Sequence, residues 1–398
     1  MTLQNSRIRY RPACLALGLL GLTACEAPVE RQEPAPPETP PPAEVRIAAA
    51  SVDAAALDQA AKLLAGLTPA TPPEAAAETW QQHGDRMAEI WSEIEGQHLG
   101  AMRTWAAAEL APADPRAPLF YPFSGPDLPS AMQFFPEAAS YVLVGLESPG
   151  RIPDLDSIAS ELDAPALEAE LGRLRTSLDN LASAGYFVTK RMETDFVAAE
   201  LEGALPFLYL FLARAGMPPT AVHFVSLEPD GSERAMATDV RVAEHAATAV
   251  RIDFGTDGTE RSLYYFSRDL SNAGLQAKPS FVAFLKRLGA FNVYLKSASY
   301  LLHMEDFTDL EALLLDHAGA VLQDDSGIPL RDFSPAVWER QFFGTYTQTL
   351  PTYREWYQDD LRAAFERVEN PQPLPFAIGY HSKTGGSCLI WAQRRSDP

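Results

Sequence analysis

From about residue 117 onward, short apolar runs alternate with stretches in which apolar residues recur at helical spacing. This alternation is typical of an α/β layer structure, because each parallel strand needs a crossover helix to reach the next strand. With 398 residues, of which 46% are hydrophobic, the chain can build a sizeable core. We therefore expect an α/β domain over residues 113–398.

The expected strands are short runs rich in β-branched and aromatic residues. They lie at 119–123, 141–147, 221–228, 248–255, 261–268, 290–296, 319–324, 375–381 and 387–393. Expected helices lie at 155–184, 194–215, 278–288, 307–317, 335–345 and 351–367. The turn sequences PDG (229–231) and TDG (256–258) predict hairpins among the middle strands, and KTGG (383–386) predicts one between the last two strands.

The expected sheet has a parallel first half and ends in an antiparallel C-terminal hairpin. This arrangement resembles the Rossmann-like fold of the class I methyltransferases. The resemblance is architectural, covers roughly 119–394, and implies a three-layer sheet with helices on both faces. The segments FYPFSGPD, LYYFSRDLS, LKSASYL and QDDSGIP also resemble those of a group of uncharacterised bacterial secreted α/β proteins. That second resemblance implies no activity.

Residues 46–112 precede this domain and show a helical pattern. Apolar side chains such as Trp80, Met87 and Met102 recur at steps of three and four residues. We expect an N-terminal helical segment whose apolar face packs on the α/β domain.

The extreme N-terminus has the features of an export signal. A segment with three arginines precedes the apolar segment 13–22, which is too short to span a bilayer as a stable helix. The tetrapeptide Leu22-Thr23-Ala24-Cys25 follows and resembles the lipobox of bacterial lipoproteins. The resemblance implies a signal peptide over 1–24, lipidation of Cys25 and membrane attachment through that lipid. An ordinary signal peptide that is cleaved nearby is the alternative.

The proline-rich residues 25–45 then predict an extended, disordered tether, because such a composition cannot build a core. Glu26 follows the cysteine, whereas the inner-membrane retention signal of that family is typically Asp at this position. The resemblance therefore implies an outer-membrane lipoprotein of the cell envelope that faces the periplasm or the cell surface.

The charge balance excludes one class of partner. The chain has 53 acidic and 32 basic residues, a net charge of −21. Because such a surface repels phosphate backbones, we do not expect nucleic acid as a partner.

Acidic residues follow several of the expected strands. The candidate ligand-binding residues are Asp127, Glu147, Asp269, Lys296, Asp324 and Asp325. Since the carboxyl ends of parallel strands meet at one edge of a sheet, these side chains are expected to converge at an acidic rim that binds a small ligand or an envelope protein. The alternatives are a carboxylate- or metal-assisted enzyme, a degenerate methyltransferase-like protein, or plain loop acids that cap helices.

The pattern of the first two strands also permits nucleotide binding. Glu147 follows Gly125 at a spacing that suits a carboxylate on a ribose. The loop has a single glycine, and the Pro126 that follows has no N–H group, which speaks against a phosphate cradle. No G-x-S-x-G or H-E-x-x-H sequence occurs. The sequence therefore identifies no cofactor, no catalytic residue and no metal ligand, and it predicts Cys388 as a buried core residue.

Overall fold

The structure is a computed structural model, and residues 47–398 form one compact unit within it. It describes residues 53–67, 74–154, 158, 162–184, 201–236, 249–255, 259–369, 371–381 and 386–395. The predicted signal peptide, Cys25 and the tether lie outside the described residues, as do the turn at 256–258 and most of the turn at 383–386.

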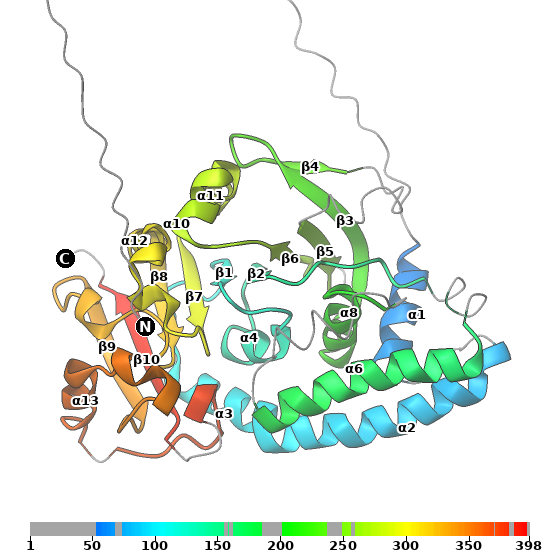
Figure 1. Cartoon of the computed structure of the whole chain (residues 1–398), viewed down its shortest axis with the longest axis horizontal. Helices are drawn as coiled ribbons and strands as arrows, with labels where there is room; N and C mark the ends of the chain where they lie inside the picture. Colours follow the sequence, from blue (N-terminus) through cyan, green and yellow to red (C-terminus); the bar gives the residue numbers. More distant parts are fainter. Residues whose placement is uncertain are drawn as a thin grey trace, which may run out of the picture. The chain divides into compact units, whose positions relative to one another are not determined.

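A ten-stranded mixed sheet forms the centre of this unit (Figure 1). Its five central strands are parallel: β6 (Arg261–Ser267), β2 (Ser140–Gly145), β1 (Leu119–Tyr121), β7 (Phe291–Leu295) and β8 (Ala318–Gln323). Counted along the chain, the parallel strands take the order third, second, first, fourth, fifth. This is the order of a Rossmann-like sheet, in which the chain direction reverses between the first and fourth strands.

Antiparallel strands extend the sheet on both sides. On one side lie β5 (Ala249–Phe254), β3 (Pro219–Leu227) and β4 (Glu233–Ala235), and on the other lie β10 (Cys388–Arg394) and β9 (Trp338–Gly344). The turn at 229–231 joins β3 to β4, an edge strand that the sequence pattern did not predict.

Helices cover both faces of the sheet, which gives three layers (Figure 1). One face carries α1 (Ala54–Leu64), α2 (Ala77–Ile94), α3 (Gly100–Glu109), α4 (Leu128–Phe134), α6 (Ala164–Ala184) and α8 (Leu205–Arg214). The other face carries α10 (Asn272–Ala277), α11 (Pro279–Arg287) and α12 (Thr308–His317). Short helices complete the described elements: η1 (Glu74–Ala76), η2 (Glu95–Leu99), η3 (Leu301–His303), η4 (Glu305–Phe307), η5 (Leu330–Asp332), η6 (Pro351–Trp356), α13 (Asp359–Phe365) and η7 (Gly379–His381).

Strand alternation separates two hydrophobic cores. Leu119 and Tyr121 of β1 lie in the core beneath α4 and α8, whereas Phe120 lies in the core beneath α11. Trp80 and Met87 of α2 and Met102 of α3 belong to the first core, as their helical spacing predicts. Cys388 is buried in a third, smaller cluster. None of the described helices combines the length and apolar character that crossing a membrane requires.

The α/β fold class with an antiparallel C-terminal strand pair is confirmed, but two elements were predicted wrongly. The helix predicted at 335–345 is β9, an edge strand that pairs with β10 along its whole length. The strand predicted at 375–381 is a loop that ends in η7. There the Ser387 hydroxyl bonds the backbone N–H and C=O of Ile378, at 3.0 and 3.1 Å, in place of a strand partner.

Three predicted helices differ in extent. Of the helix predicted at 194–215, the described residues 201–204 are not helical, and α8 begins at Leu205. The stretch predicted at 351–367 divides into η6 and α13, with a break at Tyr357. Within 155–184, the helix α6 begins at Ala164.

Candidate functional site

The carboxyl ends of the five parallel strands meet at one edge of the sheet, and the residues that follow them form the candidate site. β1 pairs with β2 on one side and with β7 on the other, so the chain direction reverses next to β1. In open α/β sheets, ligands bind at this reversal point.

The backbone amides of the loop after β1 donate hydrogen bonds to carbonyl groups of the protein. The N–H groups of Ser124 and Gly125 both donate to the carbonyl of Val144, at 2.8 and 3.3 Å. Those of Asp127 and Leu128 donate to carbonyls of the same loop, those of Ser124 and Pro126. Because these four amides already have acceptors within the protein, the geometry speaks against a phosphate cradle.

A buried ion pair connects this loop to β7. The Nζ atom of Lys296 lies 2.5 Å from Oδ2 of Asp127, and each side chain is 3% exposed. The same oxygen accepts hydrogen bonds from Tyr121 at 2.9 Å and from Ser130 at 2.6 Å. Asp127 and Lys296, both predicted site residues, therefore form a fully bonded cluster that holds the start of α4 against the end of β7.

Asp324 and Asp325 follow β8 and are both 2% exposed. Asp324 accepts hydrogen bonds from the backbone N–H of Ser297 at 2.8 Å and from the N–H and hydroxyl of Ser326. Asp325 accepts one from Tyr300. Burial, and then the charge of Asp325, raise the pKa of Asp324 to about 6. This carboxyl therefore titrates above the usual range of aspartate.

Asp127 and Asp324 lie near one another. Burial raises the pKa of the Tyr121 hydroxyl well above its usual value, and both carboxylates contribute to that rise, Asp127 more than Asp324. The structure thus brings together the acids after β1 and β8 around a tyrosine of β1.

Glu147, after β2, has a different environment. One oxygen, Oε2, accepts hydrogen bonds from the Tyr265 hydroxyl at 3.0 Å and from the backbone N–H of Leu146 at 3.1 Å. The other oxygen, Oε1, is buried and has no hydrogen-bond partner among the described residues, although the residue is only 5% exposed. An unpaired buried carboxylate oxygen is costly, so this atom calls for an explanation.

Two glycines pack against Glu147. A Cβ atom on Gly145 would lie 2.4 Å from the Glu147 carboxylate and from the Tyr265 hydroxyl, so only glycine fits there. Gly125 has φ +54, and a Cβ atom on it would meet nothing within 4 Å except the two carboxylate oxygens of Glu147. The neighbouring Leu146 is 61% exposed, one of the few large apolar side chains that are. The unpaired oxygen thus lies against Gly125, next to an exposed apolar side chain.

Asp269 does not join the rim. It is exposed, and its carboxylate accepts from the N–H and hydroxyl of Ser271, both at 2.9 Å, at the start of α10. Asp269 therefore stabilises the turn before α10, as expected for a loop acid without a role in ligand binding.

Four non-glycine residues at this edge have left-handed backbone conformations. Phe123 follows β1 with φ 60, while Ser297, Ser299 and Tyr300 follow β7 with φ between 52 and 55. Each such conformation costs of order 1 kcal/mol, and strain of this kind concentrates at functional sites. It lies here on both sides of the reversal point.

The sequence did not predict the hydroxyl groups that donate hydrogen bonds to the acidic side chains at this edge of the sheet. Tyr121, Tyr265 and Ser130 bond the acids, and Tyr300 bonds Asp325. The available signal was a tyrosine near the end of a strand that precedes an acid, as in LFYPFSGPD.

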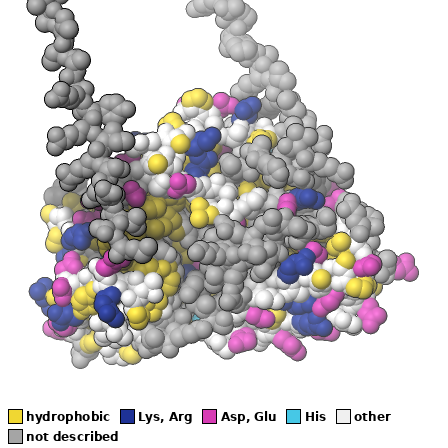
Figure 2. All heavy atoms as spheres, viewed as in Figure 1, with side chains coloured by type: hydrophobic (Ala, Val, Ile, Leu, Met, Phe, Trp, Pro, Cys, Tyr) yellow, Lys and Arg dark blue, Asp and Glu magenta, His cyan; other side chains and the backbone are white. Residues whose placement is uncertain are grey.

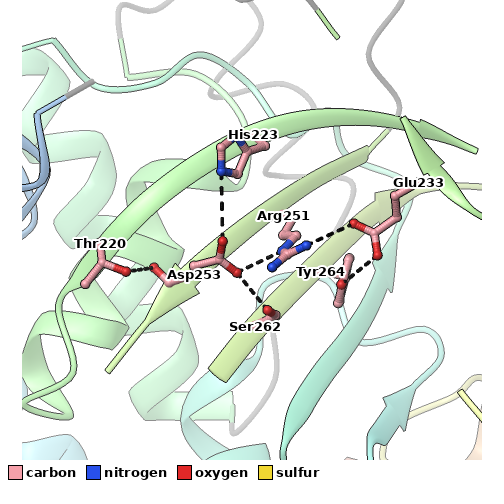
Figure 3. A network of polar contacts seen from close by, with 7 residues as sticks. All are labelled: Thr220, His223, Glu233, Arg251, Asp253, Ser262 and Tyr264. Carbon is pink, nitrogen blue, oxygen red and sulfur yellow. Dashed lines mark hydrogen bonds and ion pairs between the residues drawn. The ribbon is translucent and has the colours of Figure 1, made fainter. Parts of the chain in front are cut away.

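A second polar network lies on the antiparallel strands β3, β5 and β6 (Figure 3). Asp253 accepts from Arg251 at 2.8 Å and from Ser262 at 2.7 Å, and its other oxygen lies 3.9 Å from Nε2 of His223. The carboxylate lies between the serine and the histidine, whereas a nucleophilic relay needs the histidine in the middle. This network therefore links neighbouring strands and offers no activated serine.

Among the described residues, no group of three or more His, Cys, Asp and Glu side chains is arranged to hold a metal ion. Comparison with protein-family models, with curated proteins and with solved structures finds no match to this chain.

Proposed function

We propose that this protein is an outer-membrane lipoprotein of the cell envelope whose α/β domain binds a small organic molecule at the carboxyl edge of its parallel sheet. The lipid on Cys25 attaches it to the membrane, and the residues 25–45 hold the domain away from the bilayer. The support for this part is the order of basic, apolar and lipobox segments in the sequence.

The observation that supports binding is the unpaired Oε1 atom of Glu147, which lies beside Gly125 and next to the exposed Leu146. A buried carboxylate oxygen accepts hydrogen bonds, and it attracts a positively charged or hydroxyl-bearing group. An anionic phosphate is disfavoured by the charge of Glu147 and by the occupied amides of the loop after β1. The ligand class is therefore an amine or an alcohol with an apolar portion that contacts Leu146.

Thermal unfolding with amine and polyol probes tests this proposal. We expect spermidine, arginine or adenosine at millimolar concentration to raise the Tm of the full-length protein, and we expect Glu147→Gln to lose that rise. The matched control is Glu228→Gln, because Glu228 forms an ion pair with Arg234 at the surface. The proposal is wrong if no probe shifts the wild-type protein, or if Glu147→Gln responds as the wild type does.

A methyltransferase-like protein is the second candidate. It is favoured by the strand order, in which five parallel strands are followed by an antiparallel pair, and by the acid after the second parallel strand. Calorimetric titration with S-adenosylmethionine distinguishes the two candidates. Saturable heat with S-adenosylmethionine but not with adenosine, spermidine or arginine supports a cofactor-binding methyltransferase fold, and absence of heat with S-adenosylmethionine refutes this second candidate.

A further inference from the structure

The loop after β7 contains a second set of unpaired polar atoms. The hydroxyl oxygen of Ser297 and the Nε2 atom of His303 are both buried, and neither has a hydrogen-bond partner among the described residues. They lie at the two ends of the loop that carries the left-handed residues Ser297, Ser299 and Tyr300. The chain thus maintains a strained loop and leaves two polar atoms unpaired within it.

Aromatic rings surround this loop. The Tyr300 ring lies 4.9 Å from that of Tyr353 and 5.3 Å from that of His303, and the His303 ring lies 5.8 Å from that of Trp356. Tyr380 packs on Tyr353 and donates its hydroxyl to the carbonyl of Ser297 at 2.7 Å. Figure 2 shows hydrophobic side chains gathered in a recess over the region where Figure 1 places the end of β7.

The unpaired groups are neutral. Burial lowers the pKa of His303 to about 4, against a backbone hydrogen bond to Gly327 that raises it. A hydrogen bond that raises the pKa of an imidazole is one that the imidazole donates. Because Nε2 has no partner, Nδ1 donates this bond and carries the proton, and Nε2 is left as an acceptor. The nearby carboxylate of Asp324 already accepts from Ser297 and Ser326. A neutral ligand rich in hydroxyl groups therefore suits this place better than an ion.

We propose that Ser297, His303 and the half-buried rings of Tyr353 and Trp356 form a subsite for a sugar ring of a glycan chain. The ring faces pack against the apolar face of the sugar, and its hydroxyl groups bond the Ser297 oxygen and the His303 nitrogen. The subsite lies on the same edge of the sheet as Glu147, but it does not depend on ligand binding at Glu147.

Calorimetric titration of the full-length protein with N-acetylglucosamine tetramer, and separately with cellotetraose, tests the subsite. We expect saturable binding of at least one oligosaccharide. Tyr353→Ala and Trp356→Ala should each weaken it by about tenfold, since each removes an aromatic contact. Ser297→Ala, which removes only an unpaired hydroxyl, should weaken it without loss of folding. Trp91→Ala, a half-buried tryptophan on α2, should leave binding unchanged.

Two outcomes overturn the inference: no saturable binding by a wild-type protein that unfolds cooperatively, or equal binding by the wild type and the Tyr353, Trp356 and Ser297 variants. A protein that ignores both sugars but responds to an amine through Glu147 refutes the glycan subsite alone. Sugar binding in a protein whose Glu147→Gln variant responds to amines as the wild type does refutes only the Glu147 site.

Discussion

The ammonium group of Lys296 lies 2.5 Å from the carboxylate of Asp127, and each side chain is 3% exposed. The pair spans the reversal point of the sheet, since Asp127 precedes α4 and Lys296 follows β7. Tyr121 and Ser130 bond the same carboxylate oxygen. The pair therefore links two elements of the fold next to the proposed site, while the unpaired atoms of Glu147, Ser297 and His303 are the groups that we propose for ligand binding.

Loss of one member of this pair should be costly. Lys296→Met leaves Asp127 as a buried charge without its cation, and we expect a loss of about 3–5 kcal/mol in the free energy of unfolding, measured with urea. The double variant Asp127→Asn with Lys296→Met should recover part of it, because neither charge remains. Lys62→Met is the matched control: its ion pair with Asp58 is exposed and should contribute less than about 1 kcal/mol. Equal losses at Lys296 and Lys62 would contradict this interpretation.

Asp324 should make the protein less stable as the pH rises. Its folded pKa of about 6 lies above the usual aspartate value of 3.8, so the folded state holds a proton that the unfolded state releases between pH 4 and 6. Below pH 4 the carboxyl has no effect on the free energy of unfolding, and above pH 6 it lowers that free energy by about 3 kcal/mol. Asp324→Asn should therefore gain stability relative to the wild type between pH 4 and pH 7. A difference in unfolding free energy that stays constant across this range would show that Asp324 does not titrate as described.

His83 should have the opposite effect. Its Nε2 atom lies 2.9 Å from the carbonyl of Leu64, its Nδ1 atom lies 2.9 Å from Arg175, and burial lowers its pKa to about 4. The unfolded state gains a proton as the pH falls through 6.5, whereas the folded state resists until about pH 4. The stability that neutral His83 contributes is thus present above pH 6.5 and is lost between pH 6.5 and 4. His83→Phe should reduce the loss of unfolding free energy between pH 6.5 and 4, measured by urea titrations at several pH values. An unchanged loss in the variant would mean that other groups cause it.

The surface of α2 and α6 around His83 carries many charged side chains. Arg175 also pairs with Glu168 at 2.6 Å, and Arg86 pairs with the same carboxylate. Figure 2 shows side chains of both charges over α2 and α6. The Arg86–Glu168 pair is exposed and contributes little, whereas the Arg175 side chain is buried beside His83.

Membrane attachment should depend on a single residue. Cys25→Ser removes the proposed site of lipidation, and we expect it to move the protein from the membrane fraction to the soluble fraction after cell fractionation. Cys388→Ser is the control, because this cysteine is buried in the domain. Persistence of the Cys25→Ser variant in the membrane fraction would refute the lipoprotein assignment.

The central sheet was predictable because its strands are nearly continuous apolar runs between turn residues, as in residues 119–123 and 141–147. β9 was not, because the edge strand WERQFFG mixes long charged and aromatic side chains, and only pairing with β10 determines its conformation. Residues 375–381 show the converse. Phe376 and Ile378 are buried as in a strand, yet Gly379 turns the chain with φ +66 and the Ser387 side chain replaces the partner strand.

The positions of the site acids were predictable, but their roles were not. The order of the parallel strands follows from the α/β pattern, and it places Asp127, Glu147 and Asp324 at one edge. Whether an acid is satisfied depends on which hydroxyl or ammonium group reaches it from another element. Asp127 meets Lys296 across a long stretch of sequence, whereas Asp269 meets Ser271 within its own turn.

The unfolding free energy of Glu147→Gln, in the absence of any ligand and at pH 7, tests the central claim most directly. Glutamine keeps an oxygen for the Tyr265 hydroxyl and the Leu146 N–H, and it removes a buried charge whose Oε1 atom has no partner. If Glu147 is retained for a ligand, the variant should be as stable as the wild type or more stable, since binding groups are often kept at a cost in stability. A loss of more than about 1 kcal/mol would mean that Glu147 holds the fold together and would contradict the account.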